Sequence, residues 1–355
     1  MRFGVNFFPV VDPEIRSADA YFEDSLSLVE LAEELGFTHV QTVEHHASSY
    51  GGFSPDPLLF LASAAARTSR IRVVTGAVVA PLAHPVAIAG RLAMLDNLSK
   101  GRLDVGFGRG FLPAEFALFD VPMQTSRARF AECVEACRRL WMEEDVVVKG
   151  EFHRFGPVTV TPRPLQRPHP PIYVAAATSP DSATAAGRNG FHLQVVPSVT
   201  TTEQLREILG AYRAAWVTGG RPAGAHDIQI KYSCYLHEDR RVALAWAEQQ
   251  ERNYISHMAR AVAPLADTEH TDYPGYAAFP DKAAKYDFDA SLHANKVLAG
   301  DPDDVRRQLA EIAASLGDDL SVSLQFNAGT TELAAAAASM RLFAAHVAAQ
   351  PATVG

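Results

Sequence analysis

The sequence predicts an α/β protein folded as a TIM (β/α)8 barrel, in which eight parallel strands are each followed by a helix. The first observation is that short apolar runs alternate with longer amphipathic runs along the whole chain. The second is the length, because 355 residues fit one such barrel with insertions. The third is that polar residues gather where predicted strands end. A doubly wound open sheet, the alternative, normally has fewer repeats.

The first half of the chain supplies four strands and four helices. The first helix carries apolar residues on one side and Glu30, Glu33 and Glu34 on the other, and Gly36 ends it. The expected strands are 2–8, 38–46, 71–79 and 103–108, and the expected helices are 21–35, 56–68, 85–98 and 126–142.

The second half repeats this alternation with two interruptions. Residues 143–170 have the pattern of a small β-hairpin insertion, and 263–295 show no clear period, which suits either a lid loop or a surface insertion. We therefore expect a single barrel domain over residues 1–355. The expected strands are 171–176, 191–196, 228–236 and 320–326, and the expected helices begin near 180–182 or span 202–217, 240–262, 301–315 and 331–349.

Composition and charge exclude several classes of partner. The formal net charge of -9 argues against nucleic acid, whose binders usually present a basic face. Cys133, Cys137 and Cys234 form no CxxC and cannot all pair, which suits a reducing cytoplasm. The N-terminus has no signal-peptide pattern, and charge or proline interrupts each apolar segment before the roughly 18 residues that a membrane span needs. We expect a cytoplasmic protein without a membrane partner.

The second predicted strand delivers an acid and two imidazoles, Glu44, His45 and His46, at its carboxyl end, where parallel α/β proteins place functional side chains. A metal site is not expected, because no HExxH and no further ligands at suitable spacing are present. A proton-transferring or hydrogen-bonding imidazole fits better, since histidine titrates near neutral pH. Packing or capping at a strand end is the structural alternative. Alternation along a strand allows at most two of the three to face one site, unless the backbone turns.

Gly108, Arg109 and Gly110 end the fourth predicted strand, and the run 176–182 ends the fifth and opens a helix. Glycines permit close approach of a ligand, arginine binds phosphate or carboxylate through two bonds, and a helix start offers free N–H groups. Together they predict a phosphate site between neighbouring strands. Alternatively, Ser179 or Asp181 is only a helix cap and Arg109 a surface charge. No Walker or dinucleotide glycine motif follows a first strand, so nucleotide hydrolysis and a Rossmann site lose support.

Five runs of sequence, which lie between residues 43 and 182, carry a family resemblance. The chain resembles the bacterial luciferase family of flavin-dependent luciferase-like monooxygenases, and most of all the luciferase alpha subunit and its relatives. The runs are V-E-H-H at 43–46, T-G-A-V-V-A-P-L-A-H-P-V at 75–86, L-S-K-G-R-L-D-V-G-F-G-R-G at 98–110, S-R-A-R-F-A-E-C at 126–133 and P-I-Y-V-A-A-A-T-S-P-D-S at 171–182.

The resemblance implies a barrel that binds reduced FMN, delivered by a separate flavin reductase, and that activates oxygen as a flavin hydroperoxide. His45 matches the catalytic histidine of the family, with Glu44 and His46 beside it. Gly76 and Ala77 match a segment under the flavin ring that often carries a non-prolyl cis peptide, a bond that is rare elsewhere.

Further cofactor-binding positions carry over from the same resemblance. Glu115 matches an acidic position near the ring, and residues 264–295 match a mobile loop. The phosphate is expected to contact the matched residues Arg109, Arg127, Ala177, Thr178 and Ser182, and Gly108 is also expected to bind the cofactor.

Three residues depart from the family pattern. Gly108, Leu112 and Ala177 stand where the luciferase subunit has a cysteine, a tyrosine and a glutamate. Backbone groups can still bind the flavin, but a pocket reshaped for an organic substrate other than a long-chain aldehyde is expected.

The resulting hypothesis is a two-component flavin-dependent monooxygenase that uses reduced FMN and oxygen to oxidise a small or carrier-bound organic substrate. The resemblance also implies a homodimer. Two rivals stay open: a deazaflavin-dependent dehydrogenase on the same barrel, and a noncatalytic flavin-binding subunit of a heteromer. The intact Glu44–His46 run disfavours the second rival.

Overall fold

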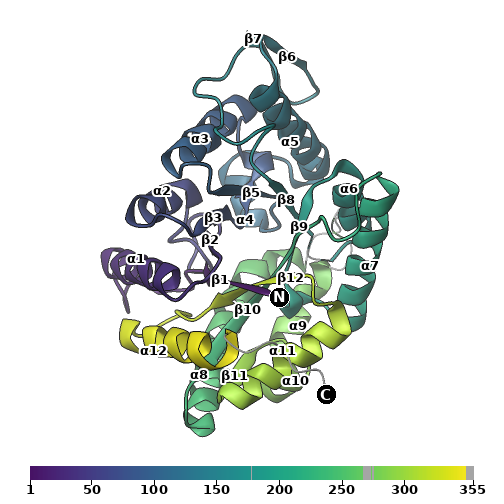
Figure 1. Ribbon diagram of the computed structural model, residues 1–355. Helices are drawn as coiled ribbons and strands as arrows, with labels where there is room; N and C mark the ends of the chain where they lie inside the picture. The colour runs from purple at the N-terminus through teal and green to yellow at the C-terminus, as the bar shows by residue number, and fades with distance from the viewer. Residues whose placement is uncertain (177, 267–272, 274–275, 349–355) are drawn as a thin grey trace.

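Parallel strands close into an eight-stranded barrel in the computed structural model, which describes residues 1–176, 178–266, 273 and 276–348 (Figure 1). The order is β12, β1, β2, β3, β5, β8, β9 and β10, and β10 pairs with both β9 and β12, which closes the barrel. The predicted TIM barrel is confirmed. The barrel strands are β1 (Arg2–Phe7), β2 (His39–Thr42), β3 (Arg72–Thr75), β5 (Leu103–Gly108), β8 (Ile172–Ala175), β9 (His192–Val195), β10 (Ile228–Leu236) and β12 (Leu320–Gln325).

Helices surround this barrel, and side chains cap the starts of several of them (Figure 1). Asp56 accepts a hydrogen bond from the N–H of Leu58, and Asp301 forms a capping box with Asp304. Gly36, at φ +82°, follows the first helix as predicted. The helices are α1 (Ala18–Glu34), α2 (Pro57–Arg67), α3 (Pro85–Leu98), α4 (Pro113–Leu118), α5 (Ser126–Met142), α6 (Pro180–Asn189), α7 (Thr202–Thr218), α8 (Arg240–Val262), α9 (Phe279–Ala284), α10 (Phe288–His293), α11 (Pro302–Leu316) and α12 (Leu333–Phe343).

Several short elements differ from the sequence-based expectation. The strand expected over 71–79 stops at Thr75. Gly76 and Ala77, joined by a cis peptide bond, separate it from β4 (Val78–Val79), which pairs with β5. Helix α4 and strand β11 (Leu298–Gly300) were not predicted, since elements of three to six residues are too short to show a period. The last helix was expected to reach residue 349, which lies outside the described residues; α12 ends at Phe343 and residues 344–348 form a π-helical turn.

The two predicted insertions have different outcomes. Residues 143–170 contain the expected antiparallel hairpin, β6 (Val146–Lys149) and β7 (Arg154–Val158), which lies beyond α3 and α5 at the top of Figure 1. The prediction of an irregular 263–295 segment is wrong for its described part, which holds α9, α10 and 3-10 turns at 263–265 and 276–278. Residues 267–272 and 274–275 of that segment lie outside the described residues.

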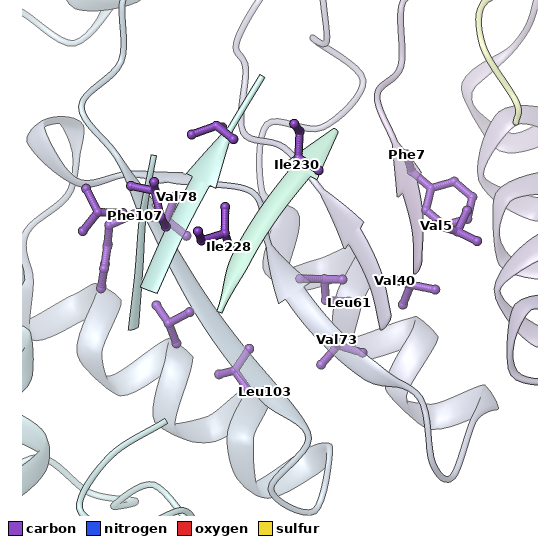
Figure 2. Close-up of a cluster of buried hydrophobic side chains, with 14 of the residues drawn as sticks. Val5, Phe7, Val40, Leu61, Val73, Val78, Leu103, Phe107, Ile228 and Ile230 are labelled. Atoms are coloured by element: carbon purple, nitrogen blue, oxygen red, sulfur yellow. The ribbon is translucent and has the colours of Figure 1, made fainter. Parts of the chain in front are cut away.

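Apolar side chains cover the outside of the barrel, whereas polar ones cross its interior. Gln41 of β2 donates to Gln229 of β10 (3.4 Å), and Gln194 of β9 donates to the same Gln229 oxygen (2.9 Å). Because β2 and β10 are not neighbours, the Gln41 bond spans the barrel. Alternation then sends the next residues on each strand outward to the helices. Figure 2 shows part of this buried apolar layer, with Val5, Phe7, Val40, Leu61, Val73, Val78, Leu103, Phe107, Ile228 and Ile230 labelled.

Candidate active site

A cavity of about 700 Å³ opens at the carboxyl ends of the barrel strands, where ligands bind in such folds. Its lining includes residues that follow β2, β3, β5 and β8, together with residues of β10 and α8. Most of the predicted site residues lie in this wall, namely Glu44, His45, Gly76, Ala77, Gly108, Arg109, Arg127, Thr178 and Ser182.

His45 is held from behind by a buried carboxylate. Its Nδ1 lies 3.0 Å from Oε1 of Glu115, and the same oxygen accepts the backbone N–H of His46 at 2.8 Å. Glu115 is only 2% exposed and belongs to α4, so it lies behind the imidazole rather than in the cavity wall. A carboxylate that accepts from Nδ1 fixes the ring, and among the described residues no hydrogen bond is recorded for Nε2.

Glu44 and His46 form a second pair beside the first. His46 Nε2 lies 3.0 Å from Glu44 Oε1, and Glu44 Oε2 accepts the N–H of Val79 at 2.9 Å. Hydrogen bonding to Glu44 raises the pKa of His46 above its ordinary value. Strand β2 ends at Thr42, and the turn that follows places Glu44 and His45 in the cavity wall while His46 packs on Phe119. Two of the three predicted residues thus face one site.

The Gly76–Ala77 cis peptide forms part of the cavity wall beside the end of β5. A Cβ atom on Gly108 would lie 3.3 Å from the Cβ of Ala77, so glycine keeps the surface between these two segments open. The carbonyl oxygen of Gly76 accepts a hydrogen bond from the ammonium group of Lys231 on β10. This contact crosses the barrel, since β3 and β10 are not neighbours.

Arginines and a helix start lie at another part of the wall. The guanidinium of Arg109 stacks on the ring of Tyr273 at 3.8 Å, and the Tyr273 hydroxyl donates to the Gly110 carbonyl at 2.9 Å. Arg127 is exposed on the first turn of α5 and also lines the cavity. Ser179 caps α6 by accepting from the N–H of Ser182 at 3.3 Å, so the capping interpretation holds for Ser179. Ala177 lies outside the described residues.

Aromatic side chains form the wall next to His45. Phe8 and Tyr50 pack at 4.9 Å between ring centroids, and Tyr50 and Tyr254 at 5.6 Å with their hydroxyls 3.0 Å apart. The imidazole of His45 lies 5.4 Å from the Tyr50 ring. These rings, which are inclined to one another, give the cavity a largely apolar side that ends in two hydroxyl groups.

The sequence alone did not predict the aromatic wall described above, nor Lys231 and Tyr273. The sequence could have indicated Lys231, because it is the one charged residue in the otherwise uncharged run I-Q-I-K-Y-S-C-Y-L of β10. No sequence pattern indicated Tyr273 apart from its place in the 263–295 segment. In the structure its ring contacts the guanidinium of Arg109. The 263–295 segment therefore reaches the site through Tyr273 and Tyr276.

The described residues hold no group of three or more His, Cys, Asp or Glu side chains placed to bind a metal ion. Within the same residues, no helix combines the length and the apolar character needed to cross a membrane.

The comparison with protein families gives the class of protein. The model of the luciferase-like monooxygenases matches residues 1–320, and the chain belongs to this family.

Individual relatives agree with that assignment. The crystal structure of monooxygenase RslO1 from Streptomyces bottropensis superposes with a TM-score of 0.89 and 49% identity, over 98% of this chain and 99% of that chain. The oxygenase component of a flavin-dependent trigonelline monooxygenase from Acinetobacter baylyi is 37% identical over 196 residues, which make up 55% of this chain and 54% of that protein. The chain thus matches about half the length of this curated relative.

A more distant structure shares the fold. The oxygenating constituent of 3,6-diketocamphane monooxygenase from Pseudomonas putida, a type II Baeyer-Villiger monooxygenase solved in complex with FMN, has a TM-score of 0.77. Its identity is 20% over 98% of each chain.

Proposed function

We propose that this protein is the oxygenase of a two-component flavin-dependent monooxygenase, which uses reduced FMN and molecular oxygen to oxidise an organic substrate. One observation carries the proposal. A histidine fixed by a buried carboxylate faces the same cavity as two arginines and a helix start, which together suit a phosphate. Family membership supports the proposal, and so do relatives named as flavin-dependent monooxygenases.

The residues of the cavity fit FMN. Arg109 and Arg127 supply charge for the phosphate, and Thr178, Ser182 and the first N–H groups of α6 supply hydrogen bonds. The missing side chain of Gly108 leaves the surface beside Gly76 and Ala77 open to a flat ring. When bound, reduced FMN supplies the electrons that activate oxygen.

In this proposal His45 acts at its Nε2 atom. Glu115 keeps the hydrogen of the pair on Nδ1 and so leaves Nε2 to accept or donate a proton in the cavity. Glu44 ties the turn after β2 to β4 through His46 and Val79, which keeps His45 beside Gly76 and Ala77. The wall of Phe8, Tyr50 and Tyr254 excludes water and receives the organic substrate.

The proposal includes a partner protein and a dimer. A separate flavin reductase would supply reduced FMN, since the oxygenase component of the trigonelline system is named as one part of such a pair. A homodimer would form through α2 and α3, which pack on each other and leave Leu59 71%, Met94 55% and Leu98 53% exposed. Large apolar side chains exposed together on adjacent helices mark an interface.

The decisive experiment combines anaerobic titration with reduced FMN and product analysis under oxygen. His45→Ala should keep the affinity for FMN within about twofold and should lower product formed per reduced FMN by about 100-fold or more. His346→Ala, which removes an exposed imidazole far along the chain, is the matched control. Undiminished turnover in His45→Ala would remove His45 from the mechanism.

The same experiment separates the rivals. A deazaflavin-dependent dehydrogenase would bind deazaflavin in preference to FMN and would turn over substrate without consuming oxygen. A noncatalytic flavin-binding subunit would bind FMN but form no product with any candidate substrate until a second chain is added.

A further inference from the structure

Lys231 lies in the cavity wall, where its ammonium group contacts the carbonyl of Gly76. It lies two residues after Gln229 on β10, so alternation directs both side chains into the barrel, with Lys231 one layer nearer the carboxyl ends. Its ammonium group crosses the interior to the carbonyl oxygen of Gly76, 155 positions away in the chain. The side chain is half-buried and lines the same cavity as His45 and Arg109.

Among the described residues, this ammonium group forms no ion pair with a carboxylate, and its hydrogen bond goes to a neutral carbonyl. An ammonium group has three donors, so two remain for a ligand. Burial lowers the pKa of Lys231 to about 7, which is the expected result of an uncompensated charge in a poorly hydrated place. A bound anion would compensate it.

We propose that Lys231 is the residue that recognises the negative charge of the reduced flavin ring, and that it makes the cavity select reduced over oxidised FMN. The inference rests on the proposed function, because it takes the ring to lie on the Gly76–Ala77 peptide. That peptide is the group that Lys231 contacts, which places the ammonium group beside the ring rather than beside the phosphate.

The chemistry of flavin explains the selection. The oxidised ring is neutral, whereas the reduced ring carries a negative charge spread over its pyrimidine part when N1 loses a proton. A cation that contacts that part stabilises only the reduced form, whereas Arg109 and Arg127 would contact a phosphate that is equally charged in both forms. Lys231 would thus serve an oxygenase that must capture reduced flavin from a reductase and release the oxidised form.

The test measures flavin affinity and potential, not turnover. Kd values for reduced FMN, under anaerobic conditions, and for oxidised FMN are measured for the wild type, Lys231→Met, Lys231→Arg and the control Lys149→Met on the exposed hairpin. Lys231→Met should weaken reduced FMN at least tenfold and oxidised FMN less than twofold. The midpoint potential of bound FMN should then fall by about 30 mV for each tenfold change. Lys231→Arg, which keeps the charge, should retain most of the selection, and Lys149→Met should match the wild type.

Three results would overturn the inference. Equal weakening of both flavin forms would mean that Lys231 only positions the Gly76–Ala77 peptide. Unchanged flavin affinity in Lys231→Met, with a raised KM for an anionic substrate, would assign the ammonium group to the substrate instead. The third is a loss of selection in a natively folded Lys231→Arg, which keeps the charge. This variant decides the question if Lys231→Met does not fold. If the wild type binds neither form of FMN, the proposed function itself fails.

Discussion

His45 and Glu115 form a buried pair in which one carboxylate oxygen contacts both the imidazole Nδ1, at 3.0 Å, and the backbone N–H of His46, at 2.8 Å. Glu115 therefore fixes the ring and the turn that carries it with a single group. The turn has a second constraint, because Gly51 packs against His45 so closely that a Cβ there would lie 2.6 Å from the ring. Such positioning residues usually matter nearly as much as the group they orient.

We predict that Glu115→Ala lowers product formation about 10- to 100-fold while FMN affinity changes little. Glu115→Gln keeps an acceptor oxygen for Nδ1 and should retain more activity than Glu115→Ala. The measurements are product per reduced FMN and Kd for FMN in both variants. If both variants lose FMN and activity together, Glu115 supports the fold rather than His45.

A second prediction concerns the phosphate contacts. Arg109→Met should weaken FMN about 10- to 150-fold, because charge-assisted hydrogen bonds are worth about 1.5–3 kcal/mol. Riboflavin, which lacks the phosphate, should bind the variant and the wild type with similar affinity. Isothermal titration with both flavins provides the comparison. An equal loss of affinity for riboflavin would mean that Arg109, which stacks on Tyr273, acts near the flavin ring and not at the phosphate.

The third prediction concerns the open surface at Gly108. Gly108→Val should block flavin binding, because even a Cβ there would lie 3.3 Å from Ala77 and two further methyl groups would extend beyond it. Gly210→Ala on α7 has no atom within 4 Å of the new Cβ and is the control. It should raise the free energy of unfolding by about 0.5–1 kcal/mol and leave flavin affinity unchanged. Flavin binding by Gly108→Val at the wild-type level would contradict the proposed ring position.

A fourth prediction tests the dimer. Leu59→Glu combined with Met94→Glu should yield a monomer, because two carboxylates would have to be buried at the α2 and α3 face. Light scattering after size-exclusion chromatography reports the mass. Val217→Glu on α7, where Val217 is 51% exposed, should leave the dimer intact. A wild-type monomer, or dimers in all three samples, would reject this interface.

The fifth prediction concerns stability in acid. His39 lies inside the barrel with Nε2 2.6 Å from the Ser323 hydroxyl, and burial lowers the pKa of His39 to about 4. In the unfolded chain the ordinary pKa of histidine is about 6.5, so the unfolded state binds a proton first as pH falls. The contribution of His39 to the free energy of unfolding is therefore complete above about pH 6.5. It is lost as the pH falls towards 4, by about 3 kcal/mol at most.

The variant His39→Gln cannot titrate and should show a flatter loss of the free energy of unfolding between pH 7 and pH 4, measured by urea titration at each pH. His346→Gln, at an exposed position, should follow the wild type. Identical slopes for His39→Gln and the wild type would mean that other groups govern the acid sensitivity.

The sequence by itself determined the order of strands and helices, and with it the barrel. Several predicted bounds agree with the structure to the residue, including α3 over 85–98, β5 over 103–108 and β10 over 228–236. It also placed Glu44, His45 and Arg109 at the ends of predicted strands, and the carboxyl ends of parallel strands share one face of the barrel. These features are local or follow from the alternation of side chains along each strand, so they can be read without knowing how distant segments pack.

Only the tertiary structure decided which groups support and which face the site. Glu115 contacts His45 across 70 positions, and Lys231 contacts Gly76 across 155 positions. Tyr273 reaches Arg109 from a segment whose six-residue helices are too short to show a period. Such contacts depend on barrel closure, which brings together strands far apart in the sequence. No local sequence pattern predicts these contacts, because the residues around a lone lysine in a strand or a tyrosine in a loop do not indicate which distant segment it will contact.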